Sequence, residues 1–262
     1  MEGFLKILFA GDIVGSSGRK ALSATLPDLC REYEIDFTVA NAENAAAGAG
    51  ITASVAADIY KAGVDVLTLG NHAWSKREVF SFIESDNRIL RPANFPDGNP
   101  GKGSLIIEKN GKILGVMQLQ GRIFMNPIDD PFKAADKELE YLKPKTRAVL
   151  VDIHAETTSE KCALAWYLDG RVSCVAGTHT HVQTADERIL PFGTSFISDV
   201  GMTGPYEGII GMDREAVLIR FLKQMPERFV PAQGKAQINA VVIDIDETTG
   251  KSRSIRRIYK IL

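Results

Sequence analysis

The amino-acid sequence predicts an α/β fold in which two mixed β-sheets pack together and helices flank them. Two observations support this prediction. Residues 5–84 alternate between strand-like and helix-like patterns, an order that implies parallel strands joined by right-handed crossovers. The later residues contain more strands and two hairpin turns, at Asn110-Gly111 and Thr249-Gly250. A parallel first part followed by a hairpin-rich second part favours two sheets over one.

The first part of the chain contains three strand–helix units. Each strand is a short apolar run, and each helix follows a loop of small or polar residues. Thr52 and Ser75 are the expected N-caps of the second and third helices. Pro27 predicts an irregularity in the first helix. The expected strands are 5–10, 37–40 and 64–69, and the expected helices are 19–33, 52–61 and 75–84.

The second part of the chain has longer irregular segments between its strands. Residues 91–103 and 120–131 are rich in turn-forming residues and are expected to be loops. Apolar runs elsewhere predict strands, and two helical patterns separate the central ones. The expected strands are 104–108, 113–119, 148–154, 172–176, 195–198, 216–221, 238–244 and 254–261, and the expected helices are 132–142 and 158–168.

The composition is that of an ordinary globular protein. Of the 262 residues, 45% are hydrophobic and 24% are charged, and the net charge is −2. This balance gives no electrostatic case for membrane binding or for stable binding of duplex nucleic acid. Three cysteines without a CxxC motif and an N-terminus without a signal-peptide pattern favour the cytoplasm. The sequence shows neither repeats nor linkers, which predicts a single domain, residues 1–262.

Every histidine of the chain ends or directly follows a predicted strand. His72 and His154 each come after an apolar run, and His179 and His181 form a His-x-His pair after another. In an extended segment such a pair directs both rings to one side, because side chains alternate along a strand. Open α/β sheets place their sites beyond the carboxyl ends of the strands. The four histidines are therefore candidates for one common site.

Carboxylate and amide residues share this position. Asp12 follows the first strand, Glu43 and Asn44 follow the second, and Asn71 follows the third. Imidazole, carboxylate and amide ligands without thiolates suit manganese, iron, zinc or cobalt. The set is too large for one ion, so it predicts two ions about 3.5–4 Å apart, bridged by a carboxylate. Such a pair acidifies a bridging water and binds both oxygens of an in-line displacement, which is the chemistry of phosphate-ester hydrolysis.

The order of these motifs resembles that of the calcineurin-like metallophosphoesterases, and nearly the whole chain is similar to their bacterial YmdB-type family. The similar segments are GDIVG at 11–15, NAENAA at 41–46, LGNH at 69–72, RPANFP at 91–96, LQGR at 119–122, HAETTSEK at 154–161, GTHTHVQTAD at 177–186 and DVGMTGP at 199–205. The resemblance implies a four-layer α/β/β/α sandwich. It also implies a cytoplasmic, homo-oligomeric phosphodiesterase acting on cyclic nucleotides, with 2′,3′-cyclic AMP as the expected substrate type and 3′,5′-cyclic AMP as a further candidate.

The resemblance also implies a role for each candidate residue. Two metal ions, iron or manganese with zinc or cobalt as alternatives, would be held by seven side chains. These are Asp12, Asn44 and His181 for the first ion, Asn71, His154 and His179 for the second, and Glu43 as the bridge. His72, with Asn71, would contact the substrate phosphate, and His72 would act as general acid for the leaving alkoxide.

The chain departs from the wider superfamily at two positions, and the YmdB-type family shares both departures. Ile13-Val14 stands where most members have the second half of an Asp-x-His motif, so one histidine ligand is missing and Asn44 is expected to replace it. Glu43 stands where most members bridge the ions with aspartate. An amide donates less charge than an imidazole, which leaves the identity of the first metal open.

Other functions stay open on the sequence alone. The same site could bind a cyclic nucleotide or an RNA end and signal by occupancy with slow turnover. It could also belong to a phosphomonoesterase of the 5′-nucleotidase type. His72 could orient a ligand rather than move a proton. Dinucleotide binding at residues 11–18 is rejected, because the glycine spacing is not GxGxxG.

Overall fold

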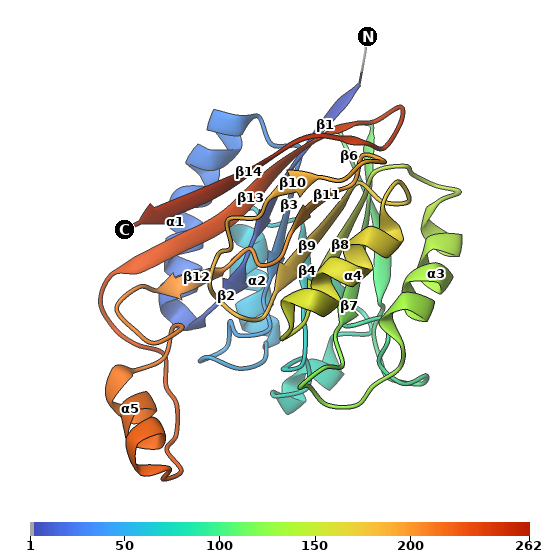
Figure 1. The fold of residues 1–262 in the computed structure, drawn as a ribbon. Helices are drawn as coiled ribbons and strands as arrows, with labels where there is room; N and C mark the ends of the chain where they lie inside the picture. The colour runs from blue at the N-terminus through green and yellow to red at the C-terminus, as the bar shows by residue number, and fades with distance from the viewer. Residues whose placement is uncertain (1–2) are drawn as a thin grey trace.

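The structure, a computed structural model, describes residues 3–262 and contains two β-sheets packed face to face (Figure 1). The strands of the first sheet are β1 (Phe4–Ala10), β2 (Asp12–Ile13), β3 (Phe37–Asn41), β4 (Val66–Thr68), β5 (Ile89–Leu90), β12 (Met202–Pro205), β13 (Ala236–Asp246) and β14 (Ser252–Ile261). Their order is β2-β12-β13-β1-β3-β4-β5, with β14 paired to β13 off this path. Strands β1, β3, β4 and β5 are parallel, whereas β13 runs antiparallel to β1.

The second sheet has the order β10-β11-β9-β8-β7-β6. Its strands are β6 (Ser104–Lys109), β7 (Lys112–Gln120), β8 (Val149–His154), β9 (Cys174–Thr178), β10 (Arg188–Ile189) and β11 (Ser195–Ile197). Strands β7, β8, β9 and β11 are parallel, and β6 joins β7 through the predicted hairpin. Asn110 and Gly111 both have positive φ, 55° and 78°, as a type I′ hairpin turn requires.

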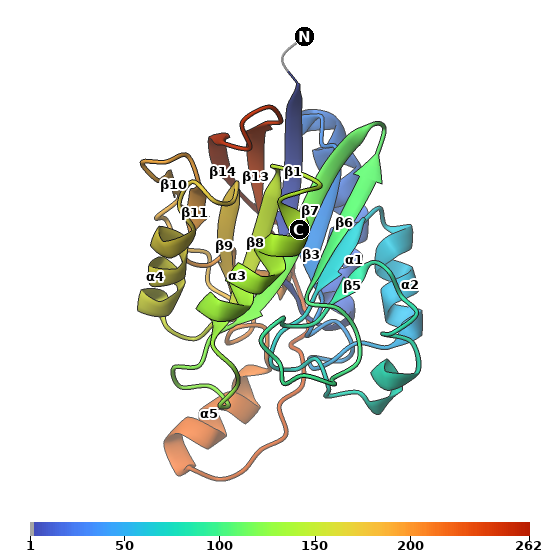
Figure 2. The same ribbon diagram turned by 90° about the vertical axis from the view of Figure 1, so that its right-hand side faces the viewer.

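Helices cover the outer faces of both sheets, which confirms the predicted four-layer arrangement. The helices are α1 (Gly15–Tyr33), α2 (Ala53–Lys61), η1 (Arg77–Ser81, a 3₁₀ helix), α3 (Pro131–Leu142), α4 (Thr158–Leu168) and α5 (Arg214–Lys223). Figure 2 shows α1 and α2 on one side of the sandwich and α3 and α4 on the other. Three apolar cores hold the layers together, one under each helix pair and one between the sheets. Among residues 3–262, no helix combines the length and the apolar character that crossing a membrane requires.

The topology determines where the site lies. The carboxyl ends of β1, β3 and β4 lie at one edge of the first sheet because these strands are parallel. The ends of β8 and β9 lie together in the second sheet for the same reason. Residues that follow these five strands can therefore meet between the two sheets.

Two expected elements were wrong. Residues 216–221, expected as a strand, lie in helix α5, because Asp213 caps that helix by accepting hydrogen bonds from the backbone N–H groups of Glu215 and Ala216 at 3.0 and 3.3 Å. Helix α5 lies apart from the sheets (Figure 1), and of its residues Val217 is buried. The helix expected over 75–84 is the short 3₁₀ helix η1, since the Ser75 hydroxyl faces His72 instead of capping a helix.

Most expected boundaries differ from the observed ones by a few residues at most. Thr52 caps α2 as predicted, accepting a hydrogen bond from the N–H of Val55 at 3.3 Å. Helix α1 begins at Gly15, four residues earlier than expected, and continues through Pro27. The expected loop at 120–131 ends at Asp130, whose side chain caps α3.

Candidate metal centre

The structure brings seven of the eight predicted site side chains into one connected cluster. They come from the last residue of β8 and from the segments that follow β1, β3, β4 and β9, strands that belong to two different sheets. Contacts of 3.9 Å or less connect the members, which are Asp12, Glu43, Asn44, Asn71, His154, His179 and His181. The strand ends therefore meet in space, and they carry these side chains with them.

His154 lies at the centre of the cluster and is completely buried. Its Nε2 is 2.9 Å from Asn71 Oδ1, 2.9 Å from His179 Nδ1 and 3.1 Å from Glu43 Oε1. A ring nitrogen can carry at most one hydrogen, so these three contacts cannot all be hydrogen bonds from His154. Donor atoms of Glu43, His154 and His179 lie within 4.8 Å of one another, as the ligands of one ion would.

A second group of donor atoms surrounds Asp12 and Asn44. Asp12 Oδ1 lies 3.8 Å from His181 Nε2 and 3.5 Å from Asn44 Nδ2, and the carboxylate is completely buried. The same Asn44 nitrogen is 3.2 Å from His181 Nε2 and 3.3 Å from Glu43 Oε1. Glu43 thus contacts both groups, through His154 on one side and Asn44 on the other.

The backbone of the His-x-His pair differs from the expected extended conformation. Strand β9 ends at Thr178, and His179 and His181 have φ values of 102° and 66°. Positive φ is uncommon outside glycine and persists where the surrounding structure enforces it. Here the N–H of His179 donates to Asp12 Oδ2 at 3.1 Å, and His181 Nδ1 lies 2.9 Å from the carbonyl oxygen of Ile210. Both rings still reach the cluster. Their direction is set by the conformation of the loop after β9 and not by the alternation of side chains along a strand.

His72 lies beside the cluster and is not one of its linked side chains. Its backbone N–H donates to Glu43 Oε2 at 2.9 Å, and its Nδ1 is 3.2 Å from the hydroxyl of Ser75. The ring is half-buried. His72 is therefore held next to the Glu43 carboxylate, with its ring oriented by Ser75.

The charges of the cluster depend on one another. Burial acts to raise the pKa of Glu43, but the charge of His154 and hydrogen bonds from His154 and His72 hold it at about 2. Burial acts to lower the pKa of His154, but Glu43 and Asp12 raise it to about 9. Burial and the neighbouring His154 lower the pKa of His179 to about 3. The buried carboxylates thus require positive charge at the centre of the site.

This donor set fits metal ions. The carboxylates of Glu43 and Asp12 are both buried beside imidazoles, and that of Glu43 is ionised. Several donor atoms lie close together, and one proton cannot form hydrogen bonds with all of them. Oxygen and nitrogen donors of this kind suit first-row transition metals.

Sequence reasoning missed the residues that support the cluster. Asp152, buried in β8, accepts hydrogen bonds from the hydroxyls of Thr68 and Thr178 at 2.6 and 2.7 Å. Thr178 in turn lies 2.9 Å from His154 Nδ1, so it fixes the orientation of that ring. Burial raises the pKa of Asp152 to about 7. An aspartate inside an apolar strand was the available signal.

Two further contacts were also missed. Lys161 and Asp199, both about 1% exposed, form an ion pair at 2.8 Å, and Asp199 accepts hydrogen bonds from the N–H and hydroxyl of Thr180. This pair holds the loop between the two histidines. Glu156 lies 3.0 Å from His179 Nε2. A lysine in the apolar segment of α4 was a signal for a buried partner, whereas nothing local distinguished Glu156.

Gly70 makes room for the cluster. A Cβ atom at this position would lie 2.3 Å from Cδ2 of His154 and 2.5 Å from Oε2 of Glu43. We expect Gly70→Ala to displace these side chains and lower the predicted phosphodiester hydrolysis at least about tenfold, the range seen when the support of a metal ligand is lost. Steady-state kinetics and metal analysis of the purified variant check this. Gly115→Ala is the control, since its added Cβ meets its nearest atoms at 3.3–3.4 Å and none of them belongs to the cluster; equal activity of the two variants would contradict the prediction.

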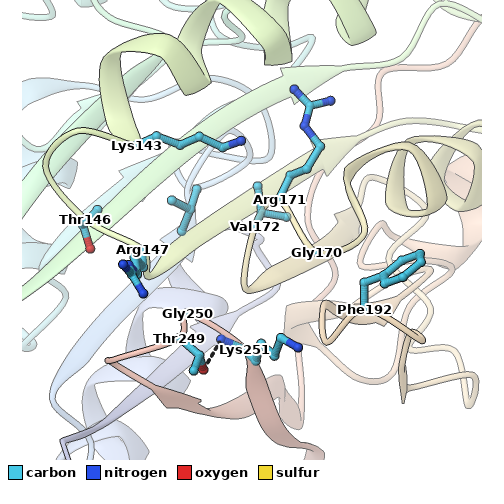
Figure 3. A pocket seen from close by; sticks show the side chains of 11 residues that line it. Lys143, Thr146, Arg147, Gly170, Arg171, Val172, Phe192, Thr249, Gly250 and Lys251 are labelled. Atoms are coloured by element: carbon cyan, nitrogen blue, oxygen red, sulfur yellow. Dashed lines mark hydrogen bonds between the residues drawn. The ribbon is translucent and has the colours of Figure 1, made fainter.

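A hollow lies at the amino ends of β8 and β9, whereas the cluster lies at their carboxyl ends (Figure 3). It is lined by residues before and at the start of β8, by residues before β9, by Phe192 and by the β13–β14 turn, and has a volume of about 260 Å³. Lys143, Arg147, Arg171 and Lys251 make it basic, but Arg171 is paired with Asp136. It contains none of the cluster residues and is not part of the site.

Comparisons with known proteins agree with this architecture. Residues 8–258 match the family described as YmdB-like protein. A 2′,3′-cyclic-nucleotide 2′-phosphodiesterase of Bacillus subtilis is 52% identical, with 97% of this chain and 96% of that protein covered. A crystal structure of a hypothetical protein from Thermus thermophilus is 46% identical with a TM-score of 0.92, covering 98% of this chain and 99% of the other. A crystal structure of a novel phosphatase from Mycoplasma pneumoniae is 34% identical with a TM-score of 0.94, covering 100% and 95%.

Proposed function

The chain belongs to the YmdB-like protein family and is a phosphoesterase, and we propose that it is a metal-dependent phosphodiesterase that opens 2′,3′-cyclic nucleotides. The observation that carries the proposal is the convergence of carboxylate, amide and imidazole donors from five strand ends on the surroundings of His154. The relative from Bacillus subtilis, named for this activity, supports the choice of substrate.

The proposed ligands fall into two sets that share Glu43. Asp12, Asn44 and His181 would hold one ion, and Asn71, His154 and His179 the other, with iron or manganese expected and zinc or cobalt as alternatives. The Asn44 amide would have to present Oδ1 rather than Nδ2 to the first ion, a choice that rotation of the amide allows. When bound, the ions would supply charge neutralisation at the phosphoryl oxygens and acidify the attacking water.

His72 is the residue we propose for proton transfer. In opening the ring, a water releases one proton to the solvent and its oxygen bonds to phosphorus, the bond from phosphorus to O2′ breaks, and O2′ takes up a proton. His72 is anchored beside the site by its N–H bond to Glu43 and by Ser75, so its ring is placed to donate that proton. The product would be a nucleoside 3′-phosphate.

The test is metal-dependent hydrolysis by the purified protein. We expect about two ions per chain, hydrolysis of 2′,3′-cyclic AMP that is lost on chelation and restored by manganese or iron, and a higher melting temperature with metal, because binding to the folded state stabilises it. Metal-free protein that stays inert after reloading would refute the proposal. Faster hydrolysis of 4-nitrophenyl phosphate than of diesters would favour a phosphomonoesterase instead.

A homo-oligomeric state and a cytoplasmic location stay predictions, to be checked by light scattering and cell fractionation.

A further inference from the structure

A small pocket adjoins the cluster on the side of Asn71. It lies between the loop after β4, the loop before β6 and the loop after β7, and its volume is about 260 Å³. Pockets that enclose whole drug-sized ligands measure roughly 300–1,000 Å³, so this one suits a single ring system. We call it the amide pocket, after the side chains of Asn71, Asn99, Gln120 and Asn126 that line it.

Gln120 lines this pocket, and its side chain has a hydrogen-bonding group without a partner. The residue is 1% exposed, and its side-chain Oε1 has no hydrogen-bond partner within residues 3–262. Its backbone is already satisfied by Asn94, whose Oδ1 accepts from the Gln120 N–H at 2.9 Å and whose Nδ2 donates to the Gln120 carbonyl at 2.8 Å. A buried acceptor without a partner is costly, so the amide is suited to a ligand that supplies one.

Aromatic side chains also line the pocket. Trp74 and Phe95 line the pocket, with ring centroids 5.7 Å apart, and Trp74 also stacks on Phe80 at 5.1 Å. These contacts hold the indole in place before any ligand arrives. Aromatic side chains next to amides are the usual means by which proteins stack unpaired nucleobases and read their edges.

The pocket is also uncharged. None of the residues that line it is acidic or basic, in contrast to the basic hollow of Figure 3. It therefore offers no positive charge to a phosphate group but suits a flat, neutral heterocycle with donors and acceptors on its edge. Asn71, a proposed metal ligand, forms part of its wall, so a ring bound here would lie next to the reacting phosphate.

We propose that the amide pocket binds the nucleobase of the substrate, with the Gln120 amide hydrogen-bonding the base edge and Trp74 and Phe95 packing against the ring. The inference rests on the proposed function, because it takes the substrate to be a nucleotide. It makes Gln120 a specificity-determining residue, and it makes Asn94 a positioning residue that joins the loop before β6 to the end of β7 and the loop after it.

Kinetics on two substrates test the role of Gln120. The ratio of kcat/KM for 2′,3′-cyclic AMP to that for glycerol 1,2-cyclic phosphate, which has no base, isolates recognition of the base. We expect Gln120→Leu to lower this ratio on the order of ten- to a hundredfold. This is the discrimination that two hydrogen bonds between an amide side chain and a base edge provide. The matched control is Gln118→Leu, a buried glutamine two residues earlier on β7 that also has an unpartnered Oε1 but lies outside the pocket. A ratio that is unchanged in Gln120→Leu would overturn the proposal. Asn126→Ala, at an exposed position, should lower the ratio as well, and it replaces Gln120→Leu if that variant does not fold.

A binding measurement separates failure of the pocket from failure of the proposed function. The chain has two tryptophans, so Trp166→Phe leaves Trp74 as the fluorescent reporter. We expect adenosine, which carries no phosphate, to quench Trp74 in the metal-loaded protein, whereas ribose does not, and Gln120→Leu to raise the adenosine Kd about tenfold. Quenching by adenosine without hydrolysis of any cyclic phosphate would refute the proposed function and keep the pocket. Hydrolysis without quenching, or with the same Kd in Gln120→Leu, would refute the pocket and keep the function.

Discussion

Replacing Glu43 by alanine is expected to lower kcat/KM for a phosphodiester about a thousandfold or more. Loss of an outer residue that only orients a metal ligand typically costs roughly 10–100-fold, and Glu43 is placed to act on both proposed ions directly. Its Oε1 lies 3.1 Å from His154 Nε2 and 3.3 Å from Asn44 Nδ2, and its Oε2 accepts the N–H of His72 at 2.9 Å. One carboxylate thus connects both ligand sets and the proposed general acid.

Metal analysis and a matched variant make this result interpretable. We expect Glu43→Ala to bind fewer than two ions per chain and to respond weakly to added manganese. Glu140→Ala removes an exposed carboxylate from α3 and should leave both metal content and turnover unchanged. Unchanged turnover in Glu43→Ala with its metal intact would rule out the bridging role.

The sequence was sufficient to predict how the cluster residues meet, because parallel topology converts sequence position into spatial position. Asp12, Glu43, Asn71 and His154 all end or follow parallel strands, and such strands end at a common edge. The hairpin at Asn110-Gly111 and the change of pattern after it predicted two packed sheets, and the histidines at the strand ends indicated that these ends meet. Strand patterns were therefore enough to bring these residues together, whereas the role of each residue came from the family resemblance.

Features that depend on tertiary contacts could not be predicted in the same way. The φ values of His179 and His181 are set by bonds to Asp12 and to the Ile210 carbonyl, partners distant in the sequence. The segment 216–221 has an apolar pattern that fits either a strand or a helix, and the cap at Asp213 decided for the helix. The unpartnered state of Gln120 Oε1 appears only when Asn94 and the surrounding loops are in place.

The second large effect is expected on stability, from Lys161→Met. Lys161 and Asp199 are buried to the same extent and lie 2.8 Å apart, and Asp199 also holds Thr180 and the N–H of Gly201. Removing the lysine leaves the Asp199 charge buried without its counter-ion, which costs about 3–5 kcal/mol of unfolding free energy. At roughly 2–4 °C per kcal/mol for a chain of this size, the melting temperature should fall by roughly 6–20 °C. Differential scanning calorimetry measures this directly.

Two comparison variants separate the loss of the ion pair from the loss of the lysine itself. Lys137→Met breaks a contact of 3.8 Å with Asp97, a pair whose side chains are 74% and 100% exposed, and exposed pairs contribute about 1 kcal/mol at most. It should hardly change the melting temperature. The double variant Lys161→Met/Asp199→Asn removes both charges, so it should be more stable than Lys161→Met alone, with a coupling energy of about 0.5–3 kcal/mol. If the double variant lost as much unfolding free energy as Lys161→Met and Asp199→Asn lose together, the two charges would not interact. In that case packing of the Lys161 methylenes against Gly177, whose added Cβ would lie 2.8 Å from Lys161 Cδ, would account for the destabilisation.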